Sequence, residues 1–176
     1  MRMPGRHGFK RTCFHADQPG AVERVNAMYT IGRICERSVV CTGAETTVQH
    51  AAKLMREHHV GSLVVVETAA GGRRPLGIVT DRDIVVEVSA LDLDAKVMTV
   101  GDIALPRLVT VFESEGLQET LAVMRSECVR RLPVVDEDGN LSGIISYDDL
   151  LTALMRELAD AAECLGGGRE KAALGG

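Results

Sequence analysis

The chain lacks the sequence features of secreted, membrane-spanning and nucleic-acid-binding proteins. Its 176 residues contain no apolar run of the length that a membrane-spanning helix needs, and the first residues lack the apolar segment of a signal peptide. We therefore expect a cytoplasmic protein with no membrane partner. The formal net charge of −5 and the missing basic stripe argue against DNA or RNA as a partner.

Motifs for metal binding and catalysis are also missing. The five cysteines are odd in number and form no Cys-x-x-Cys pair, so we expect reduced, mostly buried thiols rather than disulfides or a zinc site. Cys13 and His15 are too isolated to predict a metal centre. No nucleophile–base pattern and no glycine-rich phosphate loop is present. We expect no metal, no catalytic residue and no enzymatic activity.

What the chain does contain is an internal repeat. Residues 77–84 (GIVTDRDI) return in similar form as residues 143–150 (GIISYDDL). Residues 55–66 match residues 124–135 at six of twelve positions. The loop between the two matching blocks is three residues shorter in the second copy, and turn-forming residues fill it in both copies. A repeat of this extent predicts two copies of one structural unit.

Each copy is predicted to have the order β-α-β-β-α. Apolar residues at helical i, i+3, i+4, i+7 spacing indicate one buried helix face per copy. These residues are Val48, Ala51, Ala52 and Met55 in the first copy, and Leu117, Thr120, Leu121 and Met124 in the second. Strands are predicted at 39–41, 63–66, 76–79, 108–111, 132–135 and 141–145. Thr46 or Thr47 and Ser114 are the expected N-caps, and closing helices should begin near Asp81 and Tyr147.

The predicted organisation has four parts within an α+β fold class. We expect a disordered arm at 1–27, a first repeat at 28–90, a second repeat at 97–162 and a flexible tail at 163–176. The arm has no hydrophobic periodicity, and the tail is rich in glycine and alanine. An apolar content of 45% suffices for one core or for two small cores packed together.

A hydroxyl residue and an aspartate stand three residues apart in both copies. Thr80 and Asp83 form the first pair, and Ser146 and Asp149 form the second. Each pair resembles a capping box, which would stabilise its helix by about 1 kcal/mol without any ligand. The same geometry suits a nucleotide, because a helix N-terminus and a hydroxyl favour phosphate while a carboxylate accepts from a ribose diol. The motif therefore fits both a helix cap and a nucleotide site.

Together these features resemble the CBS domain family, named after cystathionine β-synthase. The resemblance rests on the repeated unit, on segments 77–83 and 143–149 and on VRRLPVVD at 129–136, and it extends over roughly residues 30–160. It implies a CBS fold of α/β type, in which two such domains pack with pseudo-two-fold symmetry as a Bateman module and leave two clefts. It further implies an adenosine-containing ligand (AMP, ADP or ATP) and a signal carried by a change of shape or of partner affinity.

The resemblance also assigns roles to residues. The hydroxyl residue of each pair is expected at phosphate and the aspartate at ribose. The expected ligand-binding residues are Thr80, Asp83, Ser146 and Asp149, then Val39, Val40, Val109 and Thr110 at the adenine, and Arg82, Arg130 and Arg131. Gly61 and Ser62 stand where the second copy has Arg130 and Arg131, so unequal phosphate contacts are expected. These arginines are equally consistent with solvated surface positions.

Two classes of function fit the sequence. One is a regulatory module that responds to an adenine nucleotide and acts on an unidentified regulated protein. The other is a ligand-independent structural dimerisation module whose hydroxyl–aspartate pairs only cap helices. A homodimer is expected, because the last helix has an apolar face that either supplies a dimer interface or joins the internal core. This face consists of Leu150, Leu151, Leu154 and Leu158.

Overall fold

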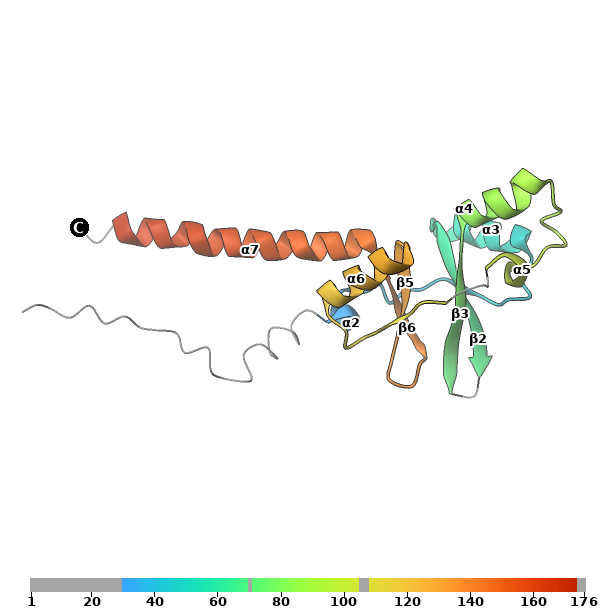
Figure 1. The fold of residues 1–176 in the computed structure, drawn as a ribbon, viewed down its shortest axis with the longest axis horizontal. Coiled ribbons are helices and arrows are strands. Elements are labelled where there is room, and N and C mark those ends of the chain that lie inside the picture. Colours follow the sequence, from blue (N-terminus) through green and yellow to red (C-terminus); the bar gives the residue numbers. More distant parts are fainter. Residues whose placement is uncertain (1–29, 70, 105–107, 174–176) are drawn as a thin grey trace, which may run out of the picture.

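The computed structural model describes residues 30–69, 71–104 and 108–173, and these residues form two three-stranded sheets with helices (Figure 1). The arm expected at 1–27 lies outside the described residues. In each sheet a short strand runs parallel to the central strand, and the central strand forms an antiparallel hairpin with the third. The α+β fold class and the two β-α-β-β-α repeats are confirmed.

The first repeat follows the predicted order. Its elements are β1 (Cys41–Thr42), α3 (Val48–His58), β2 (Ser62–Ala69), β3 (Gly72–Thr80), α4 (Asp81–Asp83), the π-helical turn η1 (Ile84–Val88) and the 3₁₀ turn η2 (Ser89–Leu91). The expected N-cap Thr47 is confirmed, because its side chain accepts a hydrogen bond from the His50 N–H at 3.3 Å. The helix expected from Asp81 begins there and then changes its winding twice within eleven residues.

The second repeat has the same order and one longer element. It consists of β4 (Val111–Phe112), α6 (Leu117–Glu127), β5 (Arg131–Val135), β6 (Leu141–Ser146) and α7 (Tyr147–Ala173). The two predicted helix faces are confirmed at their central positions. Val48, Ala51 and Met55 of α3 are buried, as are Leu117, Thr120 and Met124 of α6, while Ala52 and Leu121 are partly buried.

Three local predictions are wrong. The strands expected from Val39 and from Leu108 begin at Cys41 and at Val111 instead, because these are the first residues of the two runs that pair in register with the central strand. The expected N-cap Ser114 is replaced by Gly116. Ser114 lies in a turn that the backbone of residues 30–32 holds by pairing with residues 113–116, so α6 begins later than the hydroxyl predicts.

The two repeats exchange their leading helices, which the sequence analysis did not anticipate. Helix α2 (Ile31–Ile34) precedes the first strand of the first repeat, yet Ile31 is fully buried in the core of the second. Helix α5 (Val100–Ala104) precedes the first strand of the second repeat, and Val100 is fully buried in the core of the first. Backbone hydrogen bonds fix both exchanges, from Ile31 N to Glu115 O at 2.9 Å and from Val100 N to Thr46 O at 2.8 Å.

Helix α7 projects from the second sheet as a long rod (Figure 1). The second repeat was expected to end at 162, whereas this helix continues to Ala173. Its predicted apolar face is divided between two environments. Leu150 is fully buried and Leu154 packs against the core, while Leu151 and Leu158 are exposed. Although α7 is long, no helix of the described segments has the length and hydropathy needed to cross a membrane.

Candidate functional site

Both hydroxyl–aspartate pairs form capping boxes where a strand passes into a helix. The Thr80 hydroxyl donates to Asp83 Oδ2 (2.7 Å), the Thr80 N–H donates to the same oxygen (2.8 Å), and the Asp83 N–H donates to Thr80 Oγ1 (3.2 Å). The corresponding distances for Ser146 and Asp149 are 2.6, 2.9 and 3.2 Å. The pairs therefore cap their helices, as the local interpretation predicts.

A third pair with similar bonding shows that this motif alone does not mark a ligand site. At the start of α5, the hydroxyl and the N–H of Thr99 both donate to Asp102 Oδ2 at 2.8 Å. These backbone and side-chain hydrogen bonds lower the pKa of Asp102 below its ordinary value. Neither residue is among the described lining residues of the two clefts below. The Thr80–Asp83 and Ser146–Asp149 pairs differ from this pair because each of them lines a cleft.

The first cleft, of about 500 Å³, lies between the end of β3 and the start of β5. Thr80, Arg82 and Asp83 line it from the first repeat, and Arg130 and Arg131 line it from the second. Its other described lining residues are Ile78, Asp81, Ala104, Leu108, Val109, Cys128, Val129 and Leu132. Six of the expected ligand-binding residues are thus brought into one cavity.

The second cleft, of about 290 Å³, is built in the same way with the repeats interchanged. Ser146 and Asp149 line it together with Val39, Val40 and Arg131. Its other described lining residues are Glu36, Ser38, His59, Val60, Gly61, Ser62 and Ile144. Thr110, which was expected at an adenine, is not among the described lining residues of either cleft.

The two clefts differ in charge. Among their described lining residues, the first has three arginines with Asp81 and Asp83, and the second has one arginine with Glu36 and Asp149. The first cleft is therefore the better environment for a phosphate, since guanidinium groups bind phosphate through charge-assisted hydrogen bonds. The basic residues of the second repeat face the hydroxyl–aspartate pair of the first, a pairing that the sequence did not specify.

The arginines of the first cleft are weakly engaged within the protein. Arg130 lies 3.9 Å from Asp148, and with 79% and 74% of their side chains exposed the pair contributes little to stability. Arg131 is exposed and forms no ion pair with any residue in the described ranges. Both guanidinium groups are thus available to an anion.

His59 and Cys128 are among the lining residues that the sequence did not predict. His59 ends α3 and Cys128 ends α6, both in the left-handed conformation with φ of 54° and 55°. His59 lines the second cleft and Cys128 lines the first. The repeat alignment places these residues at equivalent positions between a helix and a strand, which is the signal that could have identified them.

Cys35, Cys41 and Cys128 are free thiols, as expected, but they are not mostly buried. Cys35 and Cys41 are half-buried and Cys128 is exposed. Burial raises the pKa of the Cys35 and Cys41 thiols. The burial prediction fails because these residues lie at strand and helix ends rather than on the inward faces.

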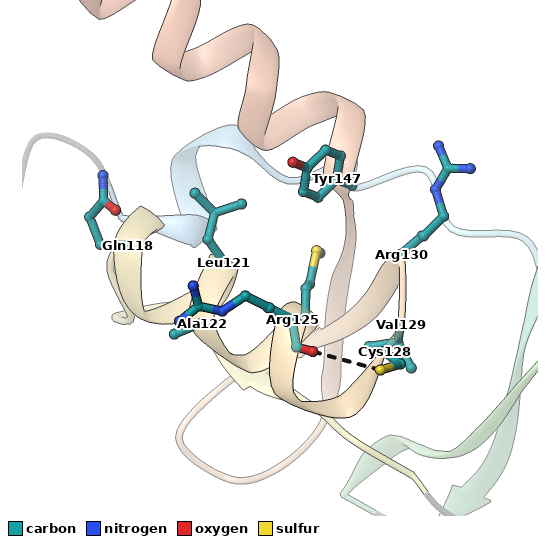
Figure 2. A pocket seen from close by; sticks show the side chains of 9 residues that line it. Gln118, Leu121, Ala122, Arg125, Cys128, Val129, Arg130 and Tyr147 are labelled. Atoms are coloured by element: carbon teal, nitrogen blue, oxygen red, sulfur yellow. Dashed lines mark hydrogen bonds between the residues drawn. The ribbon is translucent and has the colours of Figure 1, made fainter.

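A further cavity of about 640 Å³ adjoins the first cleft, with which it shares Cys128, Val129 and Arg130, and lies on the face formed by α6 and the start of α7 (Figure 2). Its walls are mainly apolar, with Leu121, Ala122 and Tyr147 facing it and Arg125 and Arg130 at its edge. Cys128 at its rim donates a weak hydrogen bond to the Arg125 carbonyl at 3.8 Å. The sequence analysis did not predict this hollow.

The structure thus defines a class of protein with two repeats, exchanged leading helices and two clefts between them, each lined by a hydroxyl–aspartate pair. The model of the CBS domain family matches residues 31–90 and 100–156, and the chain belongs to this family as a tandem CBS pair. In the described ranges, no group of three or more His, Cys, Asp or Glu side chains is placed to hold a metal ion.

Three relatives illustrate the similarity. Hypoxic response protein 1 of Mycobacterium tuberculosis is 37% identical over 70% of this chain and 83% of that protein. Its structure with two coordinated zinc ions matches with a TM-score of 0.62, covering 70% of this chain and 97% of that one. CBSX2, whose structure contains AMP, is 28% identical in sequence, and the structures match with a TM-score of 0.60 over 73% of this chain and 97% of that one. A Methanopyrus kandleri protein is 33% identical over 69% of this chain, which spans only 61% of that protein's length.

Proposed function

We propose that this CBS pair binds adenosine-containing nucleotides (AMP, ADP or ATP) in its two clefts and acts as a regulatory module rather than as an enzyme. The observation that carries this proposal is the position of the two capping boxes. Each box opens onto its own cavity beside at least one arginine, whereas the similar pair at Thr99 and Asp102 does not. The similarity to CBSX2, whose structure contains AMP, supports the same ligand class.

The chemistry of each cleft suits the parts of a nucleotide. Asp83 uses Oδ2 in its capping box, which leaves Oδ1 to accept a hydrogen bond from a ribose hydroxyl. Thr80, Arg130 and Arg131 supply a hydroxyl and guanidinium groups for phosphate. Val109 offers an apolar surface for the adenine. Ser146, Asp149, Val39 and Val40 have the same roles in the second cleft.

We further propose that the module is a homodimer formed through the exposed side of α7 and the hollow beside α6. Tyr147, Leu151, Met155 and Leu158 are exposed on α7, with Met155 65% and Leu158 70% accessible. A contiguous exposed apolar surface of this kind is typical of a protein–protein interface. A second copy would bring the same helix to the hollow in a two-fold arrangement.

Isothermal titration of AMP, ADP and ATP tests the ligand proposal. We expect the wild type to show saturable binding, with Asp83→Ala losing the first cleft and Asp149→Ala losing the second. Asp102→Ala is the matched control, because it removes a similar hydroxyl–aspartate pair that does not line a cleft. Binding that both cleft substitutions leave unchanged would refute the assigned sites.

The alternative function is structural dimerisation without a ligand, and the Thr99–Asp102 pair favours it, since a similar pair forms there without facing a cleft. Thermal unfolding separates the two functions. A ligand at one hundred times its Kd stabilises the native state by about 2.7 kcal/mol, whereas a protein without a binding site shows no shift.

A further inference from the structure

One residue, Arg131, lines both clefts. It is the first residue of β5 and is paired in register with Ser146 of β6, which belongs to the second cleft. Strands β3 and β6 are in contact, and Arg131 also lines the first cleft with Thr80 and Asp83. The two proposed phosphate sites are therefore close enough to share one side chain.

The arrangement is not symmetric between the repeats. Ser62 is the counterpart of Arg131 in the first repeat and is paired in register with Thr80. Among the described lining residues, Ser62 faces the second cleft only. Of the two clefts, Arg130 and Arg82 line only the first. The second cleft consequently depends on Arg131 for its guanidinium group, whereas the first has two others.

Resting on the proposed nucleotide function, we propose that Arg131 couples the two clefts negatively, so that a phosphate bound in the first cleft weakens phosphate binding in the second. The planar guanidinium fork binds one phosphate in bidentate fashion, which commits its donors to a single anion. A second phosphate then loses this partner and experiences the negative charge of the first. By linkage, binding in the second cleft must weaken the first by the same factor.

Adenosine provides a ligand that separates this mechanism from a general change of shape. It retains the base and the ribose diol but has no phosphate to contact Arg131. Adenosine should therefore occupy the two clefts independently, whereas AMP should not. Coupling that passes through the fold or through a dimer partner would affect both ligands.

The coupling is measured by isothermal titration with AMP. In Asp83→Ala only the second cleft should bind AMP. The affinity of this cleft for AMP is compared with the affinity of the weaker binding step of the wild type. We expect the isolated cleft to bind at least about fivefold more tightly, which is the lower end of typical coupling between sites. In the Arg131→Gln background the same comparison should give a much smaller difference, because only the repulsion between the two phosphates then remains. Arg130→Gln is the matched control, which should weaken the first cleft and keep the coupling.

The outcomes distinguish this inference from the function on which it rests. Absence of AMP binding to the wild type would overturn the proposed function and the coupling with it. Saturable AMP binding in two independent clefts would overturn the coupling alone. Coupling that persists undiminished in Arg131→Gln, or that adenosine shows equally, would also overturn the role of Arg131. Because Arg131 is exposed, the substitution should not impair folding, and unfolding curves verify this.

Discussion

The guanidinium of Arg37 forms an ion pair with the carboxylate of Glu113, although the two residues are 76 positions apart in the chain. Arg37 also donates to the Ser142 carbonyl in β6 at 3.2 Å. It lies between α2 and β1, in the segment that crosses from the second core back to the first sheet. The ion pair therefore holds the segment that follows α2 against the second repeat.

This ion pair should make stability depend on pH in the acid range. The hydrogen bond from Arg37, with a smaller contribution from Ser142, lowers the pKa of Glu113. Because the folded pKa is depressed, the stabilisation is complete above the unfolded value of about 4.3 and is lost as pH falls through the lower folded pKa. Both side chains are over one third exposed, so Glu113→Gln should cost at most about 1 kcal/mol at neutral pH. Urea unfolding from neutral to acid pH measures this. A cost that does not fall with pH would contradict the assignment.

The exchange of leading helices predicts an unusual mutational effect. Ile31 precedes the first repeat but is fully buried in the core of the second, so Ile31→Ala should lower the free energy of unfolding by about 2–5 kcal/mol. Val97→Ala, at a position 74% exposed in the linker, should change it by less than about 0.5 kcal/mol. Urea unfolding of both variants measures the difference. Equal effects would show that α2 is not docked in that core.

Gly143 is expected to tolerate no side chain. A Cβ there would lie 2.6 Å from Cys35 Sγ and 3.0 Å from the Glu36 carbonyl, where the leading segment crosses β6. Gly143→Ala should therefore destabilise the protein by about 1–3 kcal/mol through overpacking. Gly71→Ala is the control, because a Cβ there meets nothing within 4 Å. Adding Cys35→Ala should recover part of the loss, and thermal unfolding of the three variants checks this.

The proposed homodimer depends on exposed leucines of α7. Leu151→Glu with Leu158→Glu places charges on that face and leaves the buried Leu150 in place. We expect this double variant to sediment as a monomer with its fold retained, because buried unpaired charges oppose association. Analytical ultracentrifugation of wild type and variant gives the mass. An unchanged dimer, or a monomeric wild type, would exclude this interface.

Much of the local structure follows from the sequence because it depends on residues close together in the chain. The i, i+3, i+4, i+7 spacing on α3 and α6 correctly predicts which sides are buried. The Thr80–Asp83 spacing correctly predicts a capping box. Ser114 shows the limit of this reasoning, since its hydroxyl is suitable for a cap but a distant segment pairs with its turn.

The candidate site was predictable only in part. Thr80, Asp83, Ser146 and Asp149 could be selected as a repeated pair, and all four line clefts. Arg131 was also expected at a ligand, but its position in both clefts could not be predicted, because it depends on how β3 and β6 approach each other.

The patterns in the sequence are sufficient to predict two equivalent units and the order of elements within each. They also predict the inward sides of the helices, because periodicity is a property of neighbouring residues. The fold was needed to show that α2 packs in the core of the second repeat, that α5 packs in the core of the first, and that the two clefts share Arg131. The physical reason is that a short apolar helix can be buried against either sheet, and the packing of the whole chain selects between them.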